Sequence, residues 1–197
     1  MDNALLERIE TDILGRLWRG ARLRERLRAL ADFPQGRFVG TPGNRAARDY
    51  ICGQFRSAGL ADVRSEPFSL LGWERGPAWI EAAGERLPAI GLPGSPPTPP
   101  AAGIEAELVD LGPGGLEEFA AAGTRLAGRL AFASSLPVSG RRDLHRNEKF
   151  CRAAGARAAG FVYARHLPGM LEETGSVGWD RRGSRGAIPA EIGRAHV

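Results

Sequence analysis

The side chains that could bind a metal ion are few in this sequence and lie far apart. Three histidines occur, His145, His166 and His196, and none belongs to a His-Glu-x-x-His or His-x-Asp motif. His145 and Glu148 are one helical turn apart in a segment with helical periodicity, so they could share one face of a helix. A zinc site needs three or four protein ligands, and this pair is therefore expected to be a surface pair.

Activated nucleophiles are not indicated either. No Gly-x-Ser-x-Gly motif is present, and the nearest candidate, "TGSVGW" at residues 174–179, lacks the first glycine. Cys52 and Cys151 have no histidine neighbour or motif that would activate a thiol. Free cysteine behaves as a small apolar residue, so both are expected in the core, and a disulfide framework is not indicated.

One glycine-rich segment follows an expected strand and precedes an expected helix. This segment, "LGPGGLEEF" at residues 111–119, has the context of a dinucleotide-binding loop but lacks its third glycine. Glu117 and Glu118 place negative charge in the first helical turn, where a phosphate would have to bind. The acid pairs Glu117–Glu118 and Glu172–Glu173 point in different directions on a helix and are expected to be solvated. We therefore assign no catalytic, cofactor-binding or metal-binding residue from these motifs.

The composition indicates a globular protein and weakens several classes of function. Of the 197 residues 43% are apolar, and the formal net charge is +4. All but one of the 27 basic residues are arginine, and acids are interleaved with them, so a nucleic-acid-binding face is not expected. Charged residues interrupt the N-terminal segment and no run approaches a membrane span, so neither a signal peptide nor a membrane association is expected. We expect a soluble chain, with the cytoplasm favoured.

The spacing of apolar residues predicts helices in the first part of the chain. Leucines and isoleucines recur at helical spacing from Leu5 to Leu30, with a break at Gly20 and an end at residues 33–34. A further helix is predicted after the turn "TPG", with Asn44 as its N-cap and Gly59 just beyond its end. Its apolar stripe consists of Ala47, Ile51, Phe55 and Ala58.

Beyond Leu60 the pattern changes to short strand-like runs that glycine and proline divide, which is typical of an α+β or open-barrel unit. Strands are predicted at residues 63–73, 78–82, 87–92, 105–111, 128–133, 160–164 and 187–192, and helices at 116–122 and 144–154. The proline-rich "PGSPPTPP", residues 93–100, is expected to be a stiff connector, with a partner-binding motif as the alternative. The loop at 178–186 could offer Arg181, Arg182 and Arg185 to an acidic group, although a solvated loop is the simpler interpretation.

The most specific block of the sequence is "RFVGTPGNRAARDYICGQFRSAGLADVRSEPF", residues 37–68. It follows the pattern Arg-x-x-Gly-Thr/Ser-x-Gly-Asn, then Ala and Tyr-Ile/Leu along a helix, then Gly-Leu and a strand. This pattern resembles the N-terminal block of the di-zinc aminopeptidase family, which includes bacterial aminopeptidases, glutamate carboxypeptidase and the transferrin receptor. The matching positions are Arg37, Gly40, Thr41, Gly43, Asn44, Ala47, Tyr50, Ile51, Gly59 and Leu60.

Three later segments are "GRLAFA", "EKFCRAAGARAAGFVYA" and "AIPAEI", at residues 128–133, 148–164 and 187–192. They resemble the strand, helix–strand unit and closing "Ile-Pro" strand of a protease-associated domain, a module inserted near the start of many such peptidases. The matching positions are Ala153, Ala154, Gly155, Ala156, Gly160, Ile188 and Pro189.

The resemblance implies an α/β fold overall with two parts. Residues 1–70 would form the N-terminal helices and an edge strand of a peptidase domain, and residues 71–197 a β-rich α+β protease-associated domain. The family's zinc ligands and glutamate general base lie downstream of that inserted domain, and their motifs do not occur before Val197. We therefore expect a truncated fragment that is inactive alone, with zinc bound only in the missing domain.

Two functions of different class stay open. The first is the N-terminal fragment of a zinc-dependent exopeptidase, whose partners would be a peptide substrate or the missing peptidase domain, with self-association through the uncovered stripe. Aminopeptidase, carboxypeptidase and cyclase-like specificities all stay open within it, because downstream residues choose the substrate. The second is a free-standing protease-associated module that binds peptides or proteins without catalysis.

Residues 1–197 alone are predicted to hydrolyse no peptide, because two-metal hydrolysis needs ligands and a general base that these motifs do not supply. The purified chain, incubated with zinc and a mixture of short peptides, should release amino acids no faster than buffer does. Zinc-dependent release that a chelator abolishes would contradict this prediction.

Overall fold

The computed structural model describes residues 2–32, 36–70, 72–166, 175–177 and 187–194. The chain divides into two compact units, Met1–Gly72 and Trp73–Val197, which are considered separately below. The assignment of these units to a peptidase domain and a protease-associated domain stays a prediction.

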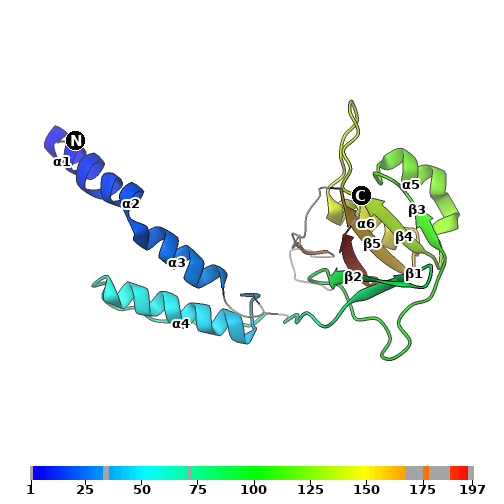
Figure 1. Ribbon diagram of the computed structural model, residues 1–197, viewed down its shortest axis with the longest axis horizontal. Coiled ribbons are helices and arrows are strands. Elements are labelled where there is room, and N and C mark those ends of the chain that lie inside the picture. The colour runs from blue at the N-terminus through cyan, green and yellow to red at the C-terminus, as the bar shows by residue number, and fades with distance from the viewer. Residues whose placement is uncertain (1, 33–35, 71, 167–174, 178–186, 195–197) are drawn as a thin grey trace. The chain divides into compact units, whose positions relative to one another are not determined.

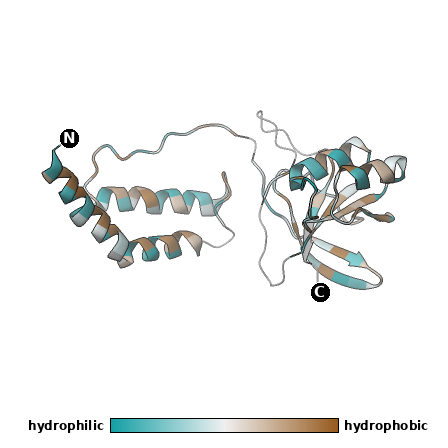
Figure 2. Ribbon diagram, turned by 90° about the horizontal axis from the view of Figure 1, so that it is seen from above, coloured by the Kyte–Doolittle hydropathy of each residue, from teal (hydrophilic) through white to brown (hydrophobic). Residues whose placement is uncertain are grey.

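The first unit begins with helices that apolar periodicity produces. They are α1 (Asn3–Arg8), the π-helical η1 (Ile9–Leu14), α2 (Gly15–Arg19) and α3 (Ala21–Ala31). Gly20 interrupts them with an extended backbone, φ −75° and ψ 125°, which confirms the predicted break. The predicted end at residues 33–34 lies outside the described residues. Figure 2 shows apolar and polar residues alternating along these helices.

The helix α4 (Pro42–Ser57) begins one turn earlier than the sequence suggested. Thr41 is its N-cap: the Thr41 Oγ1 accepts the Asn44 backbone N–H at 3.3 Å and donates to the Phe38 carbonyl at 2.6 Å. The prediction of Asn44 as N-cap is wrong, because Pro42 has a φ suited to the first helical position and already starts the helix. Gly59 has φ +80°, the left-handed conformation expected of the residue beyond a helix end.

The predicted strand at residues 63–73 is also wrong. Within residues 63–70 and 72–73, which the structure describes, no strand forms. An extended run becomes a strand only when the backbone of a neighbour pairs with it, and the described residues of this run have no such pairing.

The second unit is built on one mixed sheet of six strands in the order β1-β2-β6-β5-β4-β3 (Figure 1). The strands are β1 (Trp79–Ala82), β2 (Glu85–Gly91), β3 (Leu108–Asp110), β4 (Leu130–Ser134), β5 (Gly160–Arg165) and β6 (Ala190–Arg194). Strands β3, β4, β5 and β6 pair in parallel, whereas β1, β2 and β6 pair antiparallel.

Helices connect the parallel strands, as crossover connections require. The helix α5 (Leu116–Ala122) and the 3-10 turn η2 (Gly123–Leu126) lie between β3 and β4, and α6 (Arg146–Gly155) lies between β4 and β5. The α/β fold class is thereby confirmed, and so are the helices predicted at 116–122 and 144–154. The parallel direction of the strands was not predicted, because the sequence suggested an α+β or open-barrel unit.

A single core joins these helices to the sheet. Phe150 of α6 meets Phe161 of β5 edge-on, with ring centroids 6.0 Å apart and an interplanar angle of 79°. Residues 160–164 of β5 are all buried, which is typical of a strand with a parallel neighbour on each side. The core cluster comprises Leu92, Leu111, Phe119, Ala122, Leu126, Ala131, Ala133, Phe150, Ala153, Ala158, Phe161, Tyr163, Val177 and Ala190.

The start of the proline-rich segment packs into this unit. Residues 92–95 are buried, the Trp73 Nε1 donates to the Ser95 carbonyl at 2.9 Å, and the Val177 N–H donates to the Pro93 carbonyl at 2.8 Å. The sequence analysis, which predicted a stiff connector, did not predict that its start is packed into the fold. Its buried residues pack into the second unit, and its carbonyls accept hydrogen bonds from Trp73 and Val177.

No helix among the described residues combines the length and the apolar character that crossing a bilayer requires.

The substitution Phe161→Ala is predicted to lower the free energy of unfolding by about 3–5 kcal/mol, because it removes a buried ring and leaves a cavity. Urea denaturation of the 197-residue chain measures this change. The same substitution at Phe68, whose side chain is 75% exposed, is the matched control and should cost no more than about 0.5 kcal/mol. Equal effects at the two positions would show that the described core is not the stabilising one.

Candidate functional site

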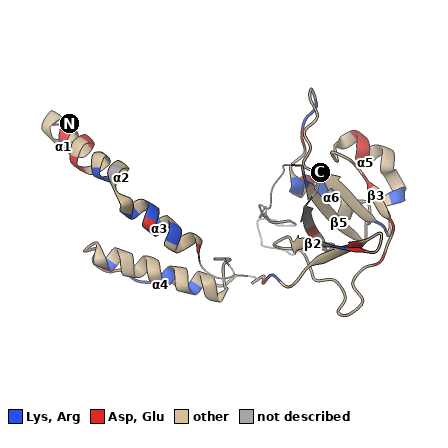
Figure 3. Ribbon diagram, viewed as in Figure 1, with Lys and Arg blue, Asp and Glu red and all other residues tan. Residues whose placement is uncertain are grey.

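Polar side chains gather where the parallel strands β3, β4 and β5 end. Ligands of open α/β sheets bind outside the carboxyl ends of the strands, so this edge is the place to look for a site. Two loops meet there, residues 111–115 after β3 and residues 135–145 after β4. Figure 3 shows acidic residues on α5 and basic residues on α6, the two helices that follow these loops.

Lys149, the single lysine of the chain, lies at the centre of this edge. Its side chain is 0% exposed, and its Nζ donates to the Ser134 carbonyl at 3.0 Å and to the Asp143 Oδ1 at 3.2 Å. The same Nζ lies 5.7 Å from the centre of the Tyr163 ring, within the range of a cation–π interaction. A buried charge is costly unless it is paired and hydrogen-bonded, and these partners meet that requirement.

Gly114 allows the lysine stem to pass. The φ of Gly114 is +60°, and a Cβ at this position would lie 3.3 Å from the Lys149 Cδ and 2.8 Å from the Ala133 Cβ. The loop after β3 therefore requires glycine here for both its backbone conformation and its close approach to the lysine.

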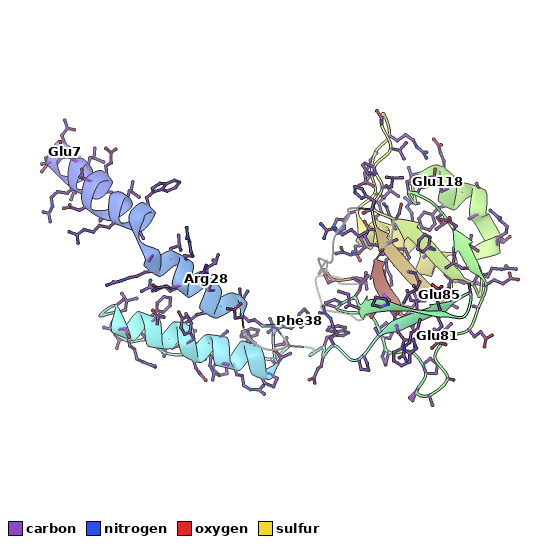
Figure 4. All side chains as sticks on the ribbon, in the orientation of Figure 1. Glu7, Arg28, Phe38, Glu81, Glu85 and Glu118 are labelled. Atoms are coloured by element: carbon purple, nitrogen blue, oxygen red, sulfur yellow. The ribbon has the colours of Figure 1, made fainter. Side chains whose placement is uncertain are left out.

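Arg141 joins the loop after β4 to the start of α5. Its guanidinium lies 3.1 Å from the Glu117 carboxylate and 2.9 Å from that of Glu118. The prediction that these acids are solvated is right for Glu117, whose side chain is 80% exposed, but wrong for Glu118, whose side chain is 23% exposed. Figure 4 labels Glu118 on α5.

The Glu118 carboxylate also accepts the Gly115 backbone N–H at 2.9 Å. An amide that a phosphate would need is thus already satisfied, and the dinucleotide-loop interpretation has no support. Hydrogen bonds from Arg141 lower the pKa of Glu118 below its ordinary value, and its partial burial opposes this shift only in part.

Ser135 and His166 form a further pair, which the sequence analysis did not find. The Ser135 Oγ and His166 Nδ1 are 2.6 Å apart, and the His166 backbone N–H donates to the same Oγ at 3.0 Å. Each residue directly follows a parallel strand, and that position was the one available signal. A serine nucleophile also needs a group that orients the histidine, and among the described residues no carboxylate bonds this ring.

His145 and Glu148 do not form the expected pair. His145 is the N-cap of α6, where its Nδ1 accepts the Asn147 N–H at 3.2 Å. Glu148 binds Arg142 at 2.8 Å and Arg152 at 3.4 Å instead. The predicted helix was right, but its first residue is Arg146, so His145 lies outside the helical face.

The remaining candidates give no metal or thiol site. The described parts of the chain contain no group of three or more His, Cys, Asp and Glu side chains that could hold a metal ion. Cys52 is half-buried and Cys151 is exposed, so the expectation of a core position is wrong for Cys151. His196, Glu172–Glu173 and the arginine loop at 178–186 lie outside the described residues, as does most of the segment 174–179.

One acid lies away from this edge, inside the sheet. Glu191 of β6 is paired with Val162 of β5 and Gly91 of β2. Burial raises the pKa of Glu191 above its ordinary value. The sequence had indicated a strand here but not the burial of this carboxyl group.

The edge is therefore a set of mutually satisfied pairs that hold loops together. Lys149, Arg141 and the Ser135–His166 pair each bind a partner from another segment. Such pairing fixes the positions of the loops after β3 and β4.

No protein-family model matches the sequence, and no curated protein matches it. Among solved structures, the chain is similar to the peptidase M28 precursor from Shewanella amazonensis SB2B, with a TM-score of 0.70 and 19% identity over 98% of this chain and 46% of that one. Two structures of BSAP, a zinc aminopeptidase from Bacillus subtilis, give TM-scores of 0.58 and 0.60 at 20% and 22% identity, over 87% of this chain and 38% of theirs.

The chain therefore has a zinc-aminopeptidase-like α/β fold. It spans less than half the length of each of these proteins.

The substitution Arg141→Met is predicted to raise the pKa of Glu118, because it removes the hydrogen bonds that lower it. The lowered pKa stabilises the folded chain above the ordinary glutamate pKa, and this contribution disappears as the pH falls through the folded-state value. The stability difference between wild type and variant should thus be largest near about pH 7 and shrink towards about pH 3.

Glu118 titration by NMR and urea denaturation at several pH values check this. Arg142→Met is the control, because Arg142 binds Glu148 rather than Glu118. An unchanged Glu118 titration in Arg141→Met would contradict the described pairing.

Proposed function

We propose that this chain is the N-terminal part of a zinc-dependent exopeptidase related to the aminopeptidases. Residues 1–70 would belong to the peptidase domain, and residues 71–197 would be a protease-associated domain that shapes substrate access. The similarity to the Shewanella peptidase M28 precursor carries this proposal, because it extends over 98% of the chain but over less than half of that protein.

The exposed apolar side chains of the first unit support the proposal. Among the residues described in this unit, only Gly43 and Ala47 are buried. Ile51 and Phe55, from the apolar stripe of α4, are 38% and 48% exposed. Helices of this length gain most of their stability from packing, so such a stripe calls for a covering surface. In the proposal the rest of the peptidase domain supplies it, and without that cover the stripe promotes self-association.

The described residues do not fit a zinc site, since they contain no cluster of potential metal ligands. We assign the zinc ligands and the general base to the part of the peptidase that lies beyond residues 1–197, and no catalytic step to this chain. Whether the substrate is cleaved as by an aminopeptidase, a carboxypeptidase or a cyclase-like enzyme depends on that part.

A second candidate is a free-standing module that binds peptides or proteins. The observation that favours it is the continuous core of the second unit, which includes Leu126, Phe150 and Phe161 and joins both α5 and α6 to the sheet. A unit with its own core can fold alone. This alternative does not explain the first unit or the exposed apolar stripe of its helix α4.

The coding sequence beyond codon 197 decides between them. The exopeptidase proposal predicts that a His-x-Asp motif and a Glu-Glu pair follow in some frame, and that the extended chain releases amino acids from peptides with zinc. Residues 1–197 are the matched control and should stay inactive in the same assay. If no such motifs follow, and residues 1–197 are monomeric and bind peptide, the free-standing module is correct instead.

A further inference from the structure

The two ends of the loop after β4 lie close together, because both bind the same side chain. We define the β4–α6 loop as residues 135–142. It starts after Ser134, the last residue of β4, and ends before Asp143. The Lys149 Nζ donates to the Ser134 carbonyl at 3.0 Å and to the Asp143 carboxylate at 3.2 Å. One amine from α6 thus joins the two ends of the loop.

The two partners of this amine differ in their exposure. The side chain of Lys149 is 0% exposed, whereas that of Asp143 is 55% exposed. The Ser134 carbonyl belongs to the sheet, but Asp143 belongs to the loop end and reaches solvent. If the loop end moves outward, Asp143 can be solvated at little cost, while the amine loses a partner and gains access to water. Loop position and amine burial are therefore coupled.

The stem of Lys149 is closely packed, and its amine is fully buried. The lysine stem passes Gly114, where a Cβ would lie only 3.3 Å from the Lys149 Cδ. An ammonium is a compact charge, whereas a guanidinium is a broad planar fork. The other 26 basic residues of the chain are all arginine. Position 149 is thus the one basic position of the chain at which lysine is found instead of arginine.

Three other side-chain ties fix the loop to its neighbours, and one of them is the pairing of Arg142 with Glu148 of α6 at 2.8 Å. Arg141 binds Glu118 of α5, and the Ser135 Oγ binds the His166 Nδ1 just after β5. They attach the sides of the loop, whereas Lys149 closes its base. A small hollow lies between this loop and the loop after β3, lined by Pro113 and Gly115 on one side and by Leu136, Val138, Arg141 and Leu144 among others on the other.

From this geometry we infer that Lys149 is a latch that holds the two ends of the β4–α6 loop together at the carboxyl end of β4. In the closed state the only ε-amine of the chain is hidden. When the contact between Lys149 and Asp143 breaks, the two ends of the loop separate and the hollow that the loop lines widens. The Lys149 amine then becomes accessible to solvent. The inference depends on the described contacts alone and does not rest on the proposed exopeptidase function.

Acylation of the amine measures the latch directly. The 197-residue chain is treated with an excess of an N-hydroxysuccinimide ester, and mass spectrometry follows Lys149 in the folded and the urea-unfolded chain. Lys149 should react about a hundredfold or more slowly in the folded chain, because only the opened loop exposes it. Asp143→Asn should speed this reaction about tenfold, the factor that loss of a charge-assisted hydrogen bond implies.

Asp110→Asn is the matched control. Asp110 lies at the same edge, but its carboxylate accepts the Gly112 N–H, a role that asparagine can keep, and it does not bind Lys149. Circular dichroism establishes that each variant is folded. The inference is wrong if Lys149 reacts equally fast in the folded and unfolded chains. It is also wrong if Lys149 in Asp143→Asn reacts at the wild-type rate, as it is expected to do in Asp110→Asn.

A second readout does not need the amine. Lys149→Met keeps an unbranched stem but removes the charge, and trypsin cleavage after Arg142 then reports loop opening. Cleavage there should become about tenfold faster than in wild type, whereas Asp110→Asn should leave it unchanged. Lys149→Arg should resemble Lys149→Met, because the fork does not fit. Wild-type cleavage rates in both lysine variants would also overturn the inference.

Discussion

The structure of the second unit depends on the parallel pairing of β5 with β4 on one side and β6 on the other. This pairing buries β5 along residues 160–164, and the parallel pairs β3–β4 and β4–β5 require the crossovers through α5 and α6. Crossovers bring the carboxyl ends of successive strands to one edge. The loop that carries Ser135, Arg141 and Asp143 meets the loop after β3 there for that reason.

Sequence patterns predicted the elements that local periodicity determines. The apolar run after Gly160 and the helix before Gly155 are both present, since burial and helical spacing act within a few residues. The N-cap was misassigned because Thr41 and Asn44 are both good caps, and only the position of Pro42 decides between them. At the edge, Arg141 lies 23 residues from Glu118 and Ser135 lies 31 from His166, so the crossovers alone bring them together.

The two units show opposite balances between helix formation and packing. In the second unit Phe150 of α6 is enclosed by the sheet, whereas in the first the exposed Phe55 and Ile51 of α4 have no such cover among the described residues. Their periodicity is equally clear in the sequence. Amphipathic spacing states that a helix has a buried face but does not state which surface buries it. The peptidase structures to which the chain is similar have more than twice its length.

The ties of the β4–α6 loop differ in how strongly dissolved salt weakens them. The Glu117 and Arg141 side chains are 80% and 33% exposed, so mobile ions screen their attraction. Lys149 is shielded from those ions by its complete burial. As ionic strength rises, we expect the Arg141–Glu117 pair to weaken more than the contacts of the buried Lys149 amine. We therefore expect the mobility of the β4–α6 loop to increase with the salt concentration.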